Sequence, residues 1–564
     1  MRLRFPSPGA TYGSLPDVFA VTKDAAIKCT VLKRPKHPAN CTQPNQPARA
    51  PTEHTMHILL LHPPQAKPAE PPAGLPLLAA TLRAHGCSCS VCDFNIEGLS
   101  YLIDREIATN DTWSRRAAKN RHRHLASLNE TATYENPDKY IRAVADINRF
   151  LENCGNTQNI QISLANYQDP YLSPLKSDDL LQQARNFQEN LFFSFFEKRL
   201  RDEVAETSPT HIGISLNYLS QALCTFAILG FLRKEFPNII LILGGGLVTT
   251  WLQSPGWHNP FDELVDYMIA GPGEEQLVEL LTGSLPVRRV SPDYSDFRRY
   301  SYLAPGFILP YAASTGCFWR KCSFCPETSE RNRYHPVTPD MAMTELEQLI
   351  RDNQPSLVHF LDNAISPAML HLLADSPLGV PWYGFVRFTK ELADPQFCRR
   401  LRRSGCVMLK LGLESGSQEI LDRMNKGIDL QLVAQVLEAL AKAGIGTYIY
   451  LLFGTPGESL TEARQTFDFV RQHHHEIHFL NLAIFNLPIG SREIDELQIS
   501  DFYEGDLSIY CDFHHPRGWN RREIRRFLES EFKREPVIHS ILQNDPIHFT
   551  SNHAPFFMPR LIRQ

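Results

Sequence analysis

The stretch YAASTGCFWRKCSFC, residues 311–325, combines a predicted strand with three closely spaced cysteines. Cys317, Cys322 and Cys325 follow the start of the stretch in a C-x4-C-x2-C pattern. Thiolates are soft ligands that suit iron–sulfur clusters and zinc. Because only three cysteines stand together, a four-iron cluster bound here would keep one iron open to another ligand. The alternatives are a zinc knuckle with a distant fourth ligand, or three unligated thiols.

Strands and helices alternate from this stretch towards the C-terminus. The clearest helix is predicted over 429–443, where Asp429 is a suitable N-cap and Gly444 ends the helical pattern. The predicted strands are 311–316, 357–362, 383–388, 407–414, 447–453 and 477–485. Six such units in succession predict a barrel or partial barrel, whose active site would lie at the C-terminal ends of the strands.

The same alternation precedes the cysteine stretch. Strands are predicted at 57–62, 90–95, 211–216, 239–243 and 267–270, with helices at 74–84 and 220–236. Continuous apolar strands between helices indicate a parallel sheet covered on both faces, with a ligand crevice at its glycine-rich strand ends. The fold class is therefore α/β, with an N-terminal Rossmann-like parallel-sheet domain, a partial (β/α)6 barrel and a small α-rich C-terminal region.

The domain limits follow from shifts in pattern. We expect the N-terminal domain at 56–290, with a polar helical insertion at about 101–205, and the barrel at 305–490. Residues 491–564 would form a C-terminal region for substrate binding or capping. Its Trp519, His553, Phe556 and Phe557 either close the barrel mouth or pack against the barrel. Residues 1–55, rich in Pro, Thr, Lys and Ala, are interpreted as a disordered leader or a mis-assigned start before Met56.

Charge and hydropathy exclude some classes of protein. The 57 basic and 62 acidic residues give a net charge of -5, which argues against a broad basic surface for nucleic acid. No stretch is apolar enough to predict a membrane span, and no apolar segment follows the basic N-terminus. We therefore predict a cytoplasmic protein, in which the 13 cysteines are thiols or metal ligands.

With this cysteine loop at the start of a predicted barrel, the chain resembles the radical S-adenosylmethionine (SAM) enzyme family over about 305–490. In that family three cysteines hold a [4Fe–4S] cluster and SAM chelates the fourth iron. One electron then cleaves SAM to methionine and a 5′-deoxyadenosyl radical. The resemblance makes Cys317, Cys322 and Cys325 the cluster ligands, although the usual family spacing, C-x3-C-x2-C, is one residue shorter.

The resemblance also implies a set of SAM-binding residues at successive strand ends. Phe324 would lie near the adenine, and Arg387 would pair with the SAM carboxylate. The full set is Phe324, Asp362, Asn363, Arg387, Glu414, Ser415, Gly454 and Thr455. The alternative is structural: Glu414 could pair with Arg387 or Lys410, and Gly454 could serve a turn.

The N-terminal domain resembles the cobalamin-binding domain that precedes many radical SAM barrels. The residues that carry this resemblance are Gly74, Leu75, Ser215, Gly244, Gly245, Gly271 and Glu274. Glycines allow close approach of a corrin, and the Ser215 hydroxyl would bond its tail. Classical cobalamin domains carry the motif D-x-H-x-x-G, whose histidine binds cobalt. The nearest match in this chain is residues 93–98, where Asn95 stands in place of the histidine. We therefore do not expect that side chain to bind cobalt. The alternative is a Rossmann-like domain that has lost cofactor binding.

Together these resemblances imply a radical SAM enzyme, most simply a cobalamin-dependent methyltransferase acting on an unactivated carbon. The alternatives are non-methylating chemistry, such as cyclisation or transfer of another SAM-derived group, and a cobalamin- or SAM-binding sensor without turnover. The implied partners are a small-molecule or peptide substrate and an electron donor such as flavodoxin or ferredoxin.

Overall fold

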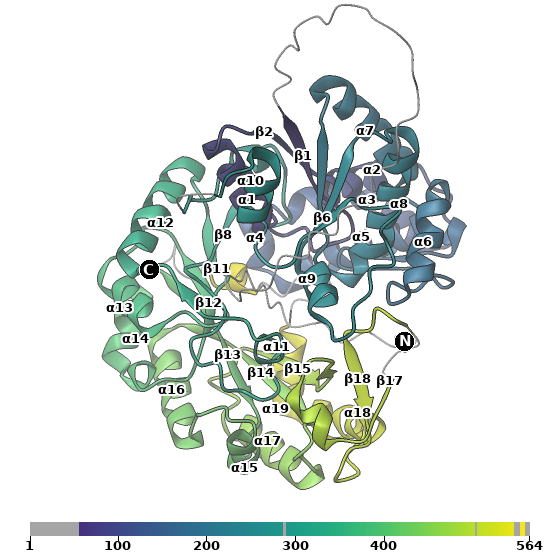
Figure 1. Ribbon diagram of the computed structural model, residues 1–564. Coiled ribbons are helices and arrows are strands. Elements are labelled where there is room, and N and C mark those ends of the chain that lie inside the picture. The colour runs from purple at the N-terminus through teal and green to yellow at the C-terminus, as the bar shows by residue number, and fades with distance from the viewer. Residues whose placement is uncertain (1–55, 286–288, 502–504, 546–552, 559–564) are drawn as a thin grey trace, which may run out of the picture.

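The computed structural model describes residues 56–285, 289–501, 505–545 and 553–558, so the predicted leader, 1–55, lies outside the described residues. Two parallel sheets dominate the chain, one in the N-terminal half and one in the C-terminal half (Figure 1). This arrangement confirms the predicted α/β fold class.

The N-terminal sheet has the order β2-β1-β5-β6-β7, and all its pairs are parallel. In β1, Ile58 and Leu60 face one apolar cluster while Leu59 and Leu61 face another, because successive side chains of a strand point to opposite faces. Helices α1 (Gly74–Ala84) and α10 (Glu274–Thr282) contribute to the first cluster and α8 (Leu219–Glu235) to the second. The strand bounds are β1 His57–His62, β2 Ser88–Asp93, β5 His211–Ser215, β6 Ile240–Gly244 and β7 Tyr267–Met268.

The second strand differs from the prediction of 90–95. It ends at Asp93, whose carboxylate accepts hydrogen bonds from the amides of Asn95 and Ile96. That N-cap starts α2 (Phe94–Asp104) two residues before the predicted strand end.

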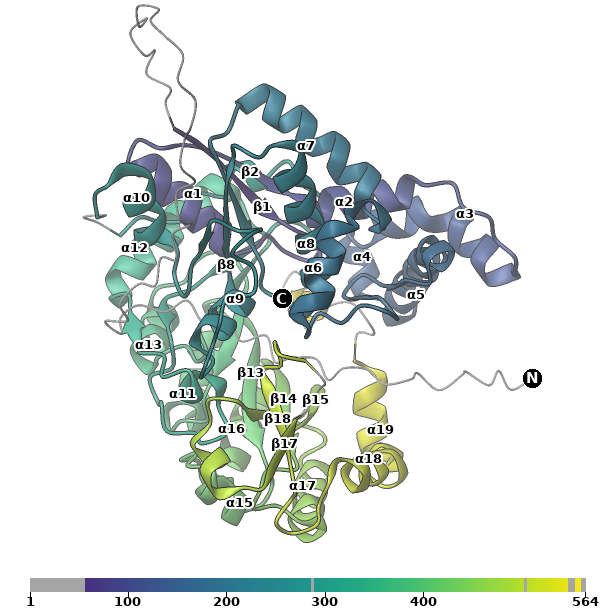
Figure 2. The same ribbon diagram turned by 45° about the vertical axis from the view of Figure 1, so that its right-hand side comes forward.

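Between β2 and β5 the chain is mainly helical. The longer helices are α2, α3 (Thr112–Ser127), α5 (Pro137–Gly155), α6 (Ser177–Arg185) and α7 (Phe193–Thr207). Most of their buried apolar residues belong to the cluster that contains Leu59 and Leu61 of β1. In Figure 2, α3 and α5 stand to the right of this sheet.

The C-terminal half contains a six-stranded parallel sheet in the order β15-β14-β13-β12-β11-β8. Helices α12 (Pro339–Asn353), α13 (Pro367–Asp375), α14 (Pro395–Arg403), α16 (Leu430–Ala443) and α17 (Leu460–Gln472) lie between or after its strands. The strands are β8 Ile308–Tyr311, β11 Leu357–Phe360, β12 Trp382–Val386, β13 Cys406–Glu414, β14 Gly446–Phe453 and β15 Phe479–Ile484. The edge strands β8 and β15 do not pair, so the barrel is partial.

The first barrel strand was predicted at 311–316, but it ends at Tyr311. The carboxylate of Asp362, at the end of the neighbouring strand, accepts hydrogen bonds from the amide of Ala313 and the hydroxyl of Ser314. The chain then forms β9 (Ser314–Thr315), which pairs with β10 (His335–Pro336) in an antiparallel arrangement. A side chain about 50 residues away in the sequence thus helps to end the strand before the cysteines.

The C-terminal region holds α18 (Arg521–Ser530) and α19 (Pro536–Gln543), and also a three-stranded antiparallel sheet that the sequence pattern did not indicate. That sheet consists of β16 (Leu487–Pro488), β18 (Tyr510–Phe513) and β17 (Ile499–Asp501). Among the described residues, no helix is long and apolar enough to cross a membrane.

Residues 553–558 pack against the bottom of the barrel rather than its mouth. The ring of His553 lies 4.2 Å from that of Tyr448, and the ring of Phe557 contacts Gly446, the first residue of β14. Phe556 packs edge-on against Tyr134 and Tyr140 of the N-terminal half. The segment therefore supports the packing alternative, because catalytic loops of a barrel lie at the opposite strand ends.

Candidate functional site

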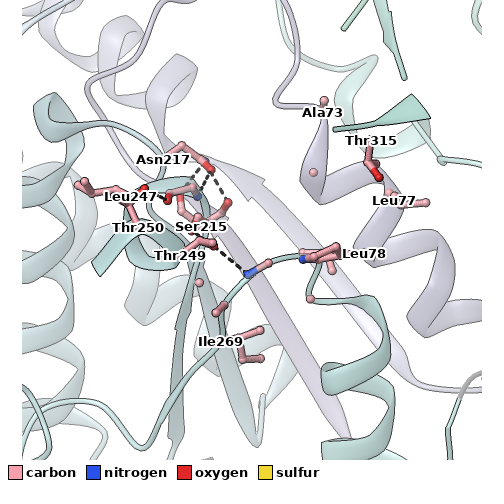
Figure 3. Close-up of a pocket in the computed structure, with 18 of the residues that line it drawn as sticks. Ala73, Leu77, Leu78, Ser215, Asn217, Leu247, Thr249, Thr250, Ile269 and Thr315 are labelled. Atoms are coloured by element: carbon pink, nitrogen blue, oxygen red, sulfur yellow. Dashed lines mark hydrogen bonds between the residues drawn. The ribbon is translucent and has the colours of Figure 1, made fainter. Parts of the chain in front are cut away.

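The C-terminal edges of both sheets face one cavity of about 1880 Å³. This volume exceeds the roughly 300–1,000 Å³ of common small-molecule sites. Figure 3 shows Ser215, Asn217 and Thr249 on one side of the cavity, with Ala73, Leu77 and Thr315 opposite. Because the lining comes from both halves of the chain, a ligand held here would contact the N-terminal sheet and the barrel together.

The seven residues expected to bind cobalamin all line this cavity: Gly74, Leu75, Ser215, Gly244, Gly245, Gly271 and Glu274. Ser215 and Gly244 are the last residues of β5 and β6 and stand opposite each other in the sheet register. Gly245 follows with φ 108°, and a Cβ atom there would overlap the carbonyl of Leu216. The glycine thus permits a backbone path along the cavity wall that other residues would not.

The strand order locates the centre of the crevice. The chain runs from β1 to β2 in one direction and from β5 through β6 to β7 in the other. The order therefore reverses between β1 and β5, which is where open α/β sheets bind ligands. His62 and Ser215, the last residues of these two strands, both line the cavity.

Buried polar atoms without hydrogen-bond partners gather around the cavity. Within the described ranges these are Nδ1 of His62, Oε1 of Gln253, Nε1 of Trp257, Oε1 of Gln276, Oγ1 of Thr315, Oε2 of Glu327 and Nε2 of His335. Buried polar atoms in native proteins are nearly always hydrogen-bonded. Their concentration here suits a large ligand that carries many donors and acceptors, as cobalamin does.

Asn95 lies elsewhere and has a structural contact. Its side chain is 2% exposed, and Oδ1 accepts a hydrogen bond of 2.8 Å from the amide of Ala66. It does not line the cavity, unlike Ala66 itself. The side chain therefore holds the loop after β1 and is not part of the cavity wall.

The loop with the three cysteines is anchored to the segment after β13. Nε1 of Trp319 donates to the carbonyl of Asn425 at 2.9 Å, and the amide of Ser323 donates to the carbonyl of Met424 at 3.0 Å. Gly427 has φ 66° and lies where a Cβ atom would overlap the Trp319 ring. These contacts give the loop a defined position between β9 and the short helix α11 (Pro326–Ser329).

Two cations lie beside the cysteines. The guanidinium of Arg387 stands 4.5 Å from the centre of the Trp319 ring, and its Nη1 is 3.9 Å from Sγ of Cys322. Burial raises the pKa of the Cys322 thiol, while the charges of Lys426 and Arg387 act to lower it. Burial also raises the pKa of Cys325, to about 12. The cations favour the thiolate form that an iron–sulfur cluster requires.

No three His, Cys, Asp or Glu side chains in the described part of the chain converge on a single metal ion. This is compatible with a [4Fe–4S] cluster, because each of its cysteines binds a different iron. Cys317, Cys322 and Cys325 lie within one loop of nine residues.

The contact of Glu414 corrects the structural alternative considered from the sequence. Its Oε1 lies 2.7 Å from Nζ of Lys426, and both side chains are largely buried. The expected partners were Arg387 or Lys410. Lys426 also lies over the ring of Phe324, at 5.5 Å, so the ion pair adjoins the cysteine loop.

The other expected SAM residues lie at several places around the C-terminal strand ends of the barrel. Asp362 is buried against β9, where burial raises its pKa to about 6. Ser415 is buried against Thr466 of α17, and Gly454 packs against Ile524 of α18. Phe324 and Thr455 line a small pocket of about 160 Å³, so the structure brings these two together.

Sequence reasoning missed a pair of carboxylates that follows the last cysteine. Glu327 is 5% exposed, and burial raises its pKa to about 7. Glu330 accepts a hydrogen bond from Oγ1 of Thr250 in the N-terminal half at 3.2 Å. Both glutamates line the cavity. The signal in the sequence was the pattern Pro-Glu-x-x-Glu at residues 326–330, PETSE, directly after Cys325.

Comparison with curated proteins gives two kinds of relative. The chain is 30% identical over 275 residues to bacteriochlorophyllide d C-12(1)-methyltransferase of Chlorobaculum tepidum, covering 46% of this chain and 58% of that protein. It is 24% identical over 284 residues to the anaerobic magnesium-protoporphyrin IX monomethyl ester cyclase of Rubrivivax gelatinosus, covering 47% and 48%. The chain thus spans about half the length of the curated relatives that it matches.

Solved structures share the fold. The cobalamin-dependent S-adenosylmethionine radical enzyme OxsB, with aqua-cobalamin bound, has a TM-score of 0.54 at 12% identity, covering 85% of this chain and 67% of that chain. The radical S-adenosylmethionine methyltransferase TsrM from Kitasatospora setae, with tryptophan and aza-SAM, has a TM-score of 0.51 at 14% identity, covering 88% and 92%. Residues 311–470 match the sequence profile of the Radical SAM superfamily. This match begins at the predicted strand before the cysteine loop, and the six-stranded partial barrel with its cysteine loop agrees with it.

Proposed function

We propose that this protein is a cobalamin-dependent radical SAM methyltransferase. The observation that carries the proposal is the single cavity at the C-terminal ends of both sheets. On the barrel side, the cavity is lined by the segment that follows the cysteine loop. On the opposite side, it is lined by the glycine-rich strand ends of the Rossmann-like sheet.

Each cofactor has a set of residues to hold it. Cys317, Cys322 and Cys325 would ligate a [4Fe–4S] cluster, and SAM would complete the coordination of its fourth iron. Ser215, Gly244 and Gly245 would border the cobalamin. When bound, the cluster would supply the electron for reductive cleavage of SAM, and cobalamin would serve as a methyl carrier. The electron would come from a donor such as flavodoxin or ferredoxin.

The position of the carboxylates supports a substrate site between the two cofactors. Glu327 and Glu330 follow the cysteine loop and line the shared cavity, and Glu330 contacts Thr250 of the N-terminal half. Buried carboxylates need donors or cations as partners. Small-molecule or peptide substrates that carry hydrogen-bond donors would satisfy them.

Anaerobic reconstitution with iron, sulfide and hydroxocobalamin tests the proposal. The loaded protein is reduced and incubated with SAM that carries a deuterated methyl group and with extract of the source cells. We expect 5′-deoxyadenosine, S-adenosylhomocysteine and a product heavier by one labelled methyl group in the mass spectrum. Without any 5′-deoxyadenosine or S-adenosylhomocysteine, the protein would instead be a sensor.

A second candidate, ring formation, is favoured by two of the relatives, which are named as anaerobic cyclases. The same assay separates the two. A cyclase would form 5′-deoxyadenosine and a new product, but that product would contain no label from the SAM methyl group.

A further inference from the structure

His62 occupies a central position in the crevice of the N-terminal sheet. It is the last residue of β1, and it adjoins the point at which the strand order reverses. Leu60 and Leu61 of the same strand pair with Gly213 and Ile214 of β5. The imidazole therefore stands beside the strand end that carries Ser215, on the wall that would border the corrin.

The environment of His62 is unusual for a structural histidine. The residue is 5% exposed and lines the cavity, yet among the described residues no hydrogen-bond partner reaches its Nδ1 atom. Burial lowers the pKa of His62 to about 4, so the imidazole is neutral at pH 7. Neutral imidazole is the form that binds transition metals.

Three other histidines line the cavity and are less suitable. Nδ1 of His359 lies 2.8 Å from Oε1 of Glu70, and its Nε2 lies 3.3 Å from Nζ of Lys410. His335 belongs to β10 on the barrel side, and His258 is exposed in the loop after α9 (Gly246–Gln253). His62 is the one of these four that lies on a strand of the N-terminal sheet.

We infer that His62, and no side chain of the stretch 93–98, is the axial nitrogen ligand of cobalt when cobalamin is bound. The inference rests on the proposed function, because it requires cobalamin in this cavity. It agrees with the expectation that Asn95 does not bind cobalt, and it assigns the ligand to another part of the same domain. The proposed cobalt ligand thus lies at the end of β1, whereas the motif match at residues 93–98 lies at the start of α2.

Electron paramagnetic resonance of the full chain tests this inference. Protein grown on nitrogen-15 is loaded with hydroxocobalamin of natural isotope content and reduced to the cobalt(II) state. We expect the nitrogen splitting to be a doublet in labelled protein and a triplet in unlabelled protein, because nitrogen-15 has spin one-half and nitrogen-14 has spin one. His62→Gln should lose this splitting, while Asn95→Ala and His335→Gln should retain it.

The possible failures are distinguishable. A triplet that persists in labelled protein would mean that the dimethylbenzimidazole of cobalamin is the ligand, and the inference would be wrong. Absence of any nitrogen splitting would also overturn it, although the proposed function would stand. Failure of the wild-type chain to retain cobalamin would overturn both. The comparison of labelled and unlabelled wild-type protein decides the matter even if His62→Gln does not fold.

Discussion

At the residue scale, the ion pair between Glu414 and Lys426 bears on whether the Glu414 carboxylate binds SAM or stabilises the fold. Their atoms lie 2.7 Å apart, and the side chains are 13% and 9% exposed. Glu414 has φ 66° at a register shift between β13 and β14. A non-glycine residue in this region is uncommon and requires support from its surroundings. The ion pair supplies that support, so Glu414 has a structural role whether or not it also binds SAM.

We predict that Glu414→Gln lowers the free energy of unfolding by roughly 1–3 kcal/mol, the scale of a charge-assisted hydrogen bond. Urea unfolding measures this change. Glu438→Gln is the control, because Glu438 pairs with Lys442 at 2.5 Å but is exposed, so this variant should show no measurable loss. If Glu414→Gln instead kept full stability and lost SAM affinity in calorimetric titration, Glu414 would be a SAM ligand and the ion pair would be incidental.

A second residue, Glu458, is buried with its charge poorly compensated. It is 0% exposed and accepts hydrogen bonds from the amide of Gly454 and from Nε1 of Trp519, at 3.0 Å for the latter. Burial raises its pKa from the ordinary 4.5 to about 7. The folded state therefore binds this proton more tightly than the unfolded state does, so ionisation opposes folding.

We predict that wild-type protein loses stability relative to Glu458→Gln as the pH rises from about 4.5 to 7. The difference of about 2.5 pKa units corresponds to roughly 3 kcal/mol. The stability that protonated Glu458 contributes is fully present below pH 4.5, the ordinary pKa of a glutamate, and is lost once the pH exceeds about 7. Urea unfolding of both proteins at several pH values measures it. A stability difference that does not change with pH would contradict the assigned shift.

At the element scale, the cysteine loop depends on the segment after β13 for its position. Trp319 fills the space above Gly427, which leaves no room for a Cβ atom. Its indole donates to the carbonyl of Asn425, and the guanidinium of Arg387 stacks on the same ring. Contacts with residues outside the C-x4-C-x2-C motif thus hold the loop in position.

Gly427→Ala should therefore reduce the iron content of the reconstituted protein at least several-fold, although all three cysteines remain. The control is Gly379→Ala, because Gly379 also has positive φ, 77°, but has open space around its Cα. Both variants share the backbone strain of a positive φ, and only Gly427→Ala displaces Trp319. Equal iron and sulfide content in the two variants would show that the Trp319 contact does not position the loop.

Elements differ in how well the sequence predicted them. Helix α1 begins and ends as predicted, at 74 and 84, because local apolar spacing determines it. The first barrel strand ends five residues early, because Asp362, two residues after β11, binds the chain after Tyr311. The glycine-rich strand ends predicted a crevice, and the cavity is found there. Lys426 and His62 could not be selected from the sequence, because only the fold brings them to Glu414 and to the crevice.

At the scale of the whole molecule, one apolar cluster runs from Ile58 in β1 to Ile541 in α19. The two sheets therefore share a core. A short C-terminal segment adds a second connection, because Phe556 packs on Tyr134 and Tyr140 while Phe557 packs on the barrel. Contacts of this extent favour cooperative unfolding of both halves, since neither half completes its core alone.

The contact between Phe557 and Gly446 tests whether this last segment stabilises the molecule. A Cβ atom at Gly446 would lie 2.5 Å from the Phe557 ring, so Gly446→Ala should displace the segment and lower stability. Phe557→Ala should cost roughly 3–5 kcal/mol, because it leaves a cavity at the bottom of the barrel. The double variant should be more stable than the sum of the two losses predicts, since the new methyl group then enters vacated space. Urea unfolding of the four proteins gives the coupling. Additive losses would mean that residues 553–558 do not hold this position against the barrel in solution.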